Sequence, residues 1–199
     1  MVAPLAPTPP HWNYFLALED DVLKLARYVE PTKQNFGTYS LELSRILFAA
    51  ASEVEVVSQQ LYANRGGKAK KAHAPDWMGE VLVSFPLILD TVVHLPRFGL
   101  SLVPWAGCDA KSPPSWWSAY NNVKHHRYAS YGEASLEHAL NAVGALFALL
   151  LFFYGDDAHH GRLTPNPTTF FAGSPFTVDR PAWGPEVNLY RLQGQDSLS

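Results

Sequence analysis

Residues 143–154 form the most apolar run of the chain, and this run constrains the fold more than any other feature. A membrane span needs about 20 apolar residues, so a run of this length is too short to cross a bilayer. A helix is predicted over 133–154, and from Val143 on it is apolar on nearly all sides. Such a helix must be covered all round by other elements, which predicts a central core helix.

Two amphipathic helices precede this helix and can cover it. The first is predicted over 12–29, where apolar side chains recur on one face until Pro31 ends the helix. The second is predicted over 40–64. Its apolar side chains follow the spacing of a helix-bundle seam: Leu43, Leu47, Ala50, Val54, Val57 and Leu61. A chain of 199 residues can bury one sizeable core, so a single, mainly helical domain is predicted.

The segments between and after these helices are less regular. Residues 77–105 are rich in Val, Ile, Leu and Phe, but three prolines interrupt any long helix there. Two short runs within them, 91–94 and 100–103, flank a Pro-Arg-Phe-Gly turn and predict a small β-hairpin. The tail over 155–199 holds five prolines and is predicted to wrap the helices as extended segments. Its expected anchors are Phe170, Phe171, Phe176 and Trp183.

Polar and aromatic side chains are concentrated in the stretch 115–128, Ser-Trp-Trp-Ser-Ala-Tyr-Asn-Asn-Val-Lys-His-His-Arg-Tyr. Two prolines followed by Ser115 indicate a helix entry with a serine cap, and Gly132 supplies a stop. Helical spacing places five side chains on one face: Trp117, Asn121, Lys124, His125 and Tyr128. Such a cluster costs stability unless it meets partners, so this helix is the best candidate for a functional site. In the alternative interpretation its aromatic residues belong to the core and its cations to a solvated turn.

The chemistry that this helix supports is acid–base catalysis or anion binding. His125 supplies a titratable imidazole, and Asn121, Lys124 and Arg127 supply hydrogen-bond donors and positive charge. We expect His125 and Asn121 to face the helix bundle or a cleft, with Arg127 turned away from both. Inside the central helix, Asn141 requires a hydrogen-bond partner, and the helix carrying Asn121 and His125 is the natural one.

Two further candidates lie on the helix predicted over 40–64. Arg45 and Glu53 are close in sequence to three small residues, 49–51, where another helix can approach. An acid and a base one turn apart usually form a surface ion pair worth only about 0.3–0.5 kcal/mol. The other interpretation is that both side chains reach the functional site as binding residues.

Several function classes lack support in the sequence. The net charge of −3 excludes a broadly basic nucleic-acid binder, although it allows a local basic patch. Cys108 is the only cysteine and has no obvious base nearby, which argues against a disulfide and against a thiol nucleophile. Neither a Gly-x-Ser-x-Gly elbow nor a dinucleotide-binding fingerprint occurs. Adjacent histidines on a helix point about 100° apart and chelate a metal poorly, so no metal or cofactor is predicted.

The motif Trp-Trp-x-x-Tyr-Asn-x-Val-Lys-His-x-Arg over 116–127 follows two amphipathic helices and an insertion and precedes an apolar helix. This arrangement resembles the HEPN superfamily (higher eukaryotes and prokaryotes nucleotide-binding domains), in particular a bacterial branch of it. Those domains are four-helix up-and-down bundles, and many are metal-independent ribonucleases of toxin–antitoxin or phage-defence systems. The resemblance implies that His125 matches the family histidine and Asn121 its polar residue. Tyr120 stands where the family has an arginine that steadies negative charge on the phosphate.

Together with this resemblance, the helix pattern predicts a mainly α fold. A single HEPN-like domain over 1–199 is expected, with a four-helix up-and-down bundle over 12–64 and 115–154. A small β-hairpin insertion over 77–105 and an irregular C-terminal wrap over 155–199 complete it. The alternative is an α+β domain in which the insertion and the tail build a true sheet.

The first functional hypothesis is an HEPN-like ribonuclease, or a degenerate relative, of a bacterial toxin–antitoxin or phage-defence system. His125 would act as base or acid on a ribose 2′-OH, Asn121 would position the phosphate, and Lys124 or Arg127 would stabilise its charge. The second is a non-catalytic nucleotide- or protein-binding module in which these residues and Tyr120 form a hydrogen-bonded core. A metal enzyme is the third.

The expected partners follow from these hypotheses. They are RNA or a nucleotide, an antitoxin protein, and a second copy of the chain, because HEPN-like domains commonly pair and two-fold dimers are the commonest oligomers. Residues 1–10 carry neither the basic nor the apolar region of a secretory signal. A cytoplasmic protein without membrane association is therefore expected.

Overall fold

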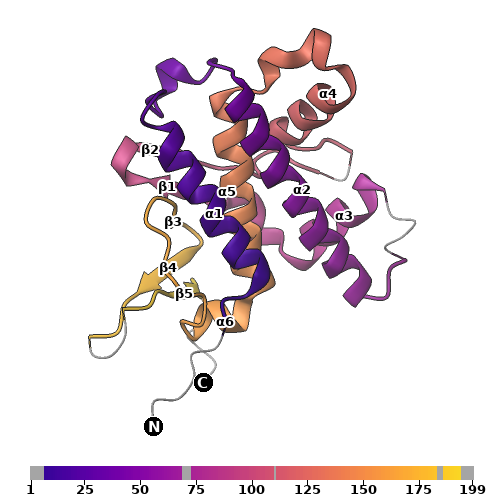
Figure 1. The fold of residues 1–199 in the computed structure, drawn as a ribbon. Helices are drawn as coiled ribbons and strands as arrows, with labels where there is room; N and C mark the ends of the chain where they lie inside the picture. Colours follow the sequence, from indigo (N-terminus) through magenta and orange to yellow (C-terminus); the bar gives the residue numbers. More distant parts are fainter. Residues whose placement is uncertain (1–6, 69–72, 110, 183–185, 194–199) are drawn as a thin grey trace.

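The structure is a computed structural model that describes residues 7–68, 73–109, 111–182 and 186–193 (Figure 1). It is mainly helical with small antiparallel sheets, as predicted. Helix α5 (Leu136–Phe153) runs through the middle, and helices α1 (Pro10–Leu25), α2 (Leu41–Asn64) and α4 (Ser115–Ser130) pack against it. The side chains of α5 are buried along most of its length, which confirms the predicted core helix.

Helix α5 is slightly shorter than the helix predicted over 133–154. It begins at Leu136, where the Ser135 hydroxyl accepts the His138 backbone N–H at 3.3 Å. Its 18 residues have a mean hydropathy of 1.8, so by length and composition alone it could cross a membrane. However, 72% of it is buried within the protein, as the core helix of a folded domain would be, so this is weak evidence for a span.

Helices α1 and α2 occupy the predicted segments with small shifts at their ends. The Ser40 hydroxyl caps α2 by accepting the Leu43 N–H at 3.1 Å, and the predicted seam of α2 is buried. Helix α1 starts at Pro10, because proline fits the first turn of a helix, and it ends at Leu25 rather than at the predicted Val29. Short 3-10 turns connect the longer elements at Lys33–Asn35, Pro86–Asp90, Pro96–Phe98 and Tyr131–Glu133.

Helix α3 (Ala74–Ser84), which packs against α2, was not predicted. Its start is stabilised by the His73 backbone N–H, which donates to the Asp76 carboxylate at 2.8 Å. Trp77, Met78 and Val81 are buried. Their helical spacing covers only about one turn, in a segment rich in Val, Ile, Leu and Phe that prolines interrupt, which is why the pattern did not predict a helix.

The predicted hairpin forms from β1 (Val93–Leu95) and β2 (Leu100–Leu102), with Gly99 at φ 62° in its turn. Strand β3 (Phe171–Ala172) from the tail pairs with the other edge of β1 and gives a sheet in the order β2-β1-β3. The prediction of a separate hairpin insertion and an irregular tail was therefore wrong for this pair of strands. The two segments share one small sheet, as the α+β alternative required.

The rest of the tail consists of a short helix, α6 (Gly155–His159), and an antiparallel pair, β4 (Phe176–Asp179) and β5 (Leu189–Leu192). Of the predicted anchors, Phe170 and Phe176 are buried and Phe171 is half-buried. Trp183 lies outside the described residues. Aromatic side chains thus hold this proline-rich segment to the helices.

A buried carboxylate on α1, that of Glu19, also holds the tail. Its oxygens accept the backbone N–H groups of three consecutive residues: Thr168 at 3.0 Å, Thr169 at 2.7 Å and Phe170 at 3.0 Å. The Phe170 ring then packs edge-on against Phe15, with the centroids 5.9 Å apart. The sequence analysis missed Glu19. It lies between Phe15 and Val22 on the apolar face of α1, where a charge needs partners, and that position was the signal.

Candidate functional site

The first half of α4 belongs to the core. Five of its side chains are buried: Trp116, Trp117, Ala119, Tyr120 and Val123. The Trp116 indole N–H donates to the Pro104 carbonyl at 2.8 Å, and the Trp117 ring packs edge-on against Trp77 at 4.9 Å between centroids. Ser115 does not cap the helix as predicted, because Pro114 takes the cap position without a side-chain hydrogen bond. The aromatic residues of this half are explained by packing.

The second half of α4 is exposed. The helix geometry breaks at His126, with φ −136° and ψ 39°. Six consecutive side chains are exposed around this kink: Lys124, His125, His126, Arg127, Tyr128 and Ala129. The predicted face of α4 therefore starts in the core, at Trp117, and ends in solvent, at Tyr128.

Asn121 and His125 both lie on α4, but their surroundings differ. Asn121 is half-buried, and its side-chain amide donates to the Trp117 carbonyl of the same helix at 3.0 Å. His125 is exposed rather than turned into the bundle, and its ring lies 6.4 Å from that of His126. An exposed imidazole is available to a ligand, whereas the Asn121 amide donor is already used within the helix.

Lys124 and Tyr120 are joined on the same turn. The Lys124 ammonium donates to the Tyr120 hydroxyl at 3.1 Å and lies 5.1 Å from the centre of its ring. This hydrogen bond raises the pKa of Lys124, so the side chain stays protonated at neutral pH. The Tyr120 ring itself is buried between Phe48 and Trp117, each 5.1 Å away between centroids. The positive charge of Lys124 thus lies over the Tyr120 ring.

Exposed aromatic rings adjoin these cations. Tyr128 is fully exposed, and the Arg127 guanidinium lies 5.0 Å from the centre of the Tyr131 ring. Tyr39, also exposed, packs edge-on against Tyr131 at 5.6 Å between centroids. We name these seven residues the α4 surface: Lys124, His125, His126, Arg127, Tyr128, Tyr131 and Tyr39. Neither Tyr39 nor Tyr131 was predicted to belong to the site, because their contact forms only when the fold brings residue 39 next to the end of this helix.

Arg45 and Glu53 have partners on α1 and α2. Arg45 forms ion pairs of 2.6 Å with Asp21 and with Glu42, and hydrogen bonds to Glu42 and Asp21 raise the pKa of its guanidinium. A Glu53 oxygen lies 2.6 Å from the Nδ1 atom of His11. The structure therefore does not bring these two side chains together with His125 in one polar cluster.

Asn141 was predicted to be buried against α4, and this prediction was wrong. The residue is only half-buried, and its amide donates to the Glu137 carbonyl of its own helix at 2.9 Å. Its hydrogen-bonding need is met locally, one turn away on α5. It therefore gives no support for a polar core around Asn121 and His125.

Other chemistries find little support in the residues that the structure describes. Cys108 is buried, and burial raises the pKa of its thiol to about 11, so it is a poor nucleophile. Among the described residues, no three His, Cys, Asp or Glu side chains are grouped so as to hold a metal ion.

Comparisons with protein-family models, with curated proteins and with solved structures find no match for this chain. The α4 surface itself therefore has to indicate the function. That surface offers exposed cations, tyrosine rings and two exposed imidazoles, from α4, the 3-10 turn that follows it, and Tyr39.

Proposed function

We propose that this protein is an HEPN-like RNA-binding protein that takes single-stranded RNA on the α4 surface. The observation that carries the proposal is the alternation of cations and rings there, with Tyr128 fully exposed and Arg127 stacked on Tyr131. RNA phosphates are attracted to lysine and arginine, and unpaired bases stack on aromatic side chains and guanidinium planes. The overall charge of −3 restricts such binding to a local patch.

The family assignment is part of this proposal. Helices α1, α2, α4 and α5 would be the four members of an up-and-down bundle, with the family motif on α4. Tyr120 replaces the family arginine and is buried, which favours a degenerate, binding member over an efficient nuclease. The expected setting is a bacterial toxin–antitoxin or phage-defence system, with an antitoxin protein as a second partner.

Fluorescence anisotropy with a labelled single-stranded RNA of about 12 nucleotides tests binding directly. We expect saturable binding that weakens with salt. With two phosphate contacts, from Lys124 and Arg127, the slope of log K against log salt should be about −1.4. The same sequence as a duplex should bind more weakly, because its bases cannot stack on the tyrosines. Absence of binding at low salt would contradict the proposal.

Metal-independent RNA cleavage by His125 is a second candidate function. The specific observation in its favour is the Lys124 ammonium over Tyr120, which puts a cation near the place of the family arginine. In the presence of a chelator, His125→Ala should then lower the cleavage rate about 10²- to 10⁴-fold. The matched variant His159→Ala, which removes an exposed histidine on α6 outside the α4 surface, should keep the rate.

Both histidines are exposed, so neither substitution should change the melting temperature, and a loss of activity can be assigned to chemistry. RNA that stays intact with the wild-type protein removes the second candidate and leaves the binding proposal standing. Fragments that persist in His125→Ala also remove it, because the imidazole would then be unnecessary.

We also propose a homodimer, because HEPN-like domains commonly pair across their motif helices and two-fold dimers are the commonest oligomers. Light scattering at micromolar concentration measures this. A mass near twice 22.1 kDa supports pairing, and a mass of 22.1 kDa contradicts it.

A further inference from the structure

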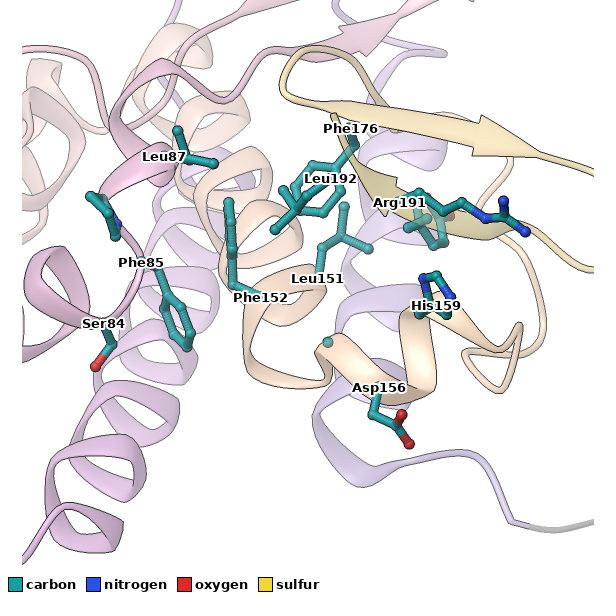
Figure 2. A pocket seen from close by; sticks show the side chains of 13 residues that line it. Ser84, Phe85, Leu87, Leu151, Phe152, Asp156, His159, Phe176, Arg191 and Leu192 are labelled. Carbon is teal, nitrogen blue, oxygen red and sulfur yellow. The ribbon is translucent and has the colours of Figure 1, made fainter. Parts of the chain in front are cut away.

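A cavity of about 680 Å³ lies at the end of the molecule that carries α6 and β5, away from α4 (Figures 1 and 2). It is bounded by the segment after α3, the ends of α5 and α6, and strands β4 and β5. Most of its lining is apolar: Phe85, Leu87, Leu151, Phe152, Phe176 and Leu192. Pockets of this size, with a mainly apolar lining, are typical sites for small molecules.

The apolar walls are held in place by aromatic packing. The Phe152 ring stacks on Phe85 with the centroids 5.4 Å apart, and on its other side it lies 4.9 Å from Phe176. Tyr190 is almost completely buried, and this burial raises the pKa of its hydroxyl to about 12, so it stays neutral. A ligand would therefore meet a preformed apolar surface from three elements.

The polar side chains of the lining differ in how far their hydrogen bonds are satisfied. Asp156 is engaged by the Arg162 guanidinium and by His160, whose Nδ1 atom is 3.2 Å from the carboxylate. The Ser84 hydroxyl donates to Glu80 at 2.7 Å. The acceptor and hydroxyl groups of the rim are thus already used by neighbouring side chains.

Two side chains of the rim, His159 and Arg191, keep N–H groups that no hydrogen bond in the described residues uses. Figure 2 shows them next to each other, at one end of the row of apolar side chains. Arg191 forms an ion pair with Asp179 through its Nε atom, which lies 3.5 Å from the carboxylate. Within the part of the chain that is described, neither the two terminal guanidinium nitrogens of Arg191 nor the His159 imidazole makes a hydrogen bond. Because the guanidinium offers only donors and the imidazole offers at least one, a ligand with acceptors fits this end.

We propose that this pocket binds an apolar monocarboxylate, with its hydrocarbon body over Phe152 and Phe176 and its carboxylate at His159 and Arg191. A guanidinium and an imidazole can together hold a planar carboxylate by charge-assisted hydrogen bonds. The apolar floor supplies affinity by removing the hydrocarbon from water. This site is independent of the RNA-binding proposal, since it lies on other elements.

Isothermal titration of the full-length protein with decanoate, and separately with decanol, tests the proposal. We expect decanoate to bind with a Kd between about 10 µM and 1 mM, and decanol to bind about tenfold more weakly. Arg191→Gln should weaken decanoate binding about tenfold and His159→Gln about fivefold. His160→Gln is the matched control, because His160 is the next residue but does not line the pocket.

Melting temperatures of the three variants should stay at the wild-type value, since these side chains are partly or fully exposed. No decanoate binding by the wild-type protein would overturn the proposal. Equal binding of decanol and decanoate, or equal binding by Arg191→Gln, His159→Gln and His160→Gln, would overturn it too, because the two donors would then play no part.

Discussion

Replacing Glu19 by alanine is expected to lower the free energy of unfolding by about 3 kcal/mol. The variant leaves the N–H groups of Thr168, Thr169 and Phe170 without their charged acceptor in a buried site. Each unsatisfied buried donor costs about 1–3 kcal/mol, and release of the tail into water limits the sum. For a domain of this size, the melting temperature should fall by roughly 6–12 °C. Thermal and urea unfolding followed by circular dichroism measure both quantities.

Two matched variants show whether the hydrogen bonds are the cause. Glu19→Gln keeps the oxygen that accepts from all three residues but removes its charge, so an intermediate loss is expected. Asp20→Asn removes a charge from the next, exposed position and should change stability by less than about 0.5 kcal/mol. A Glu19→Ala protein as stable as the wild type would show that the tail does not depend on this carboxylate.

The triple variant Lys124→Ala/Arg127→Ala/Tyr128→Ala is expected to raise the Kd for single-stranded RNA about 100-fold or more. Loss of one stacked base costs about 1–3 kcal/mol, and loss of two cations removes two phosphate contacts. The salt slope should become shallower by about 1.4. Anisotropy titrations at several salt concentrations give both the affinity and the slope.

The matched control removes the same residue types from other exposed positions, as Lys24→Ala/Arg97→Ala/Tyr28→Ala. Tyr28 is 84% exposed, and Arg97 lies over the Phe98 ring at 5.5 Å, much as Arg127 lies over Tyr131. This control should bind RNA within about twofold of the wild-type protein. Equal losses in both triple variants would mean that general charge, rather than the α4 surface, attracts the RNA.

Long periodic helices were the part of the fold that the sequence predicted well. The seam of α2 and the apolar character of α5 extend over many turns, so their periodicity is unambiguous. Helix α3 was not predicted because its eleven residues carry only a brief apolar pattern, beside a segment rich in Val, Ile, Leu and Phe that prolines interrupt. The pairing of β3 with β1 joins His94 to Phe171, and local patterns carry no information about contacts over such a separation.

The candidate site was predicted in part. The spacing rules correctly placed Asn121, Lys124 and His125 on one helix, but they could not show that the helix leaves the core halfway along. They also assigned Asn141 a partner on another helix, although the carbonyl of Glu137, one turn away, meets its need. Side-chain amides on helices often find such local acceptors, which sequence reasoning underestimates.

By itself, the sequence determined where the long helices form, which of them is central, and which helix carries the polar residues, because hydrophobic periodicity and helix caps are local properties. Only the tertiary structure decided which of those polar side chains face solvent. It also decided that Tyr39 joins Tyr131, that Glu19 holds the tail, and that a pocket opens beside Arg191. These features depend on contacts between residues far apart in the chain, and such contacts are selected by the packing of the whole core rather than by any one segment.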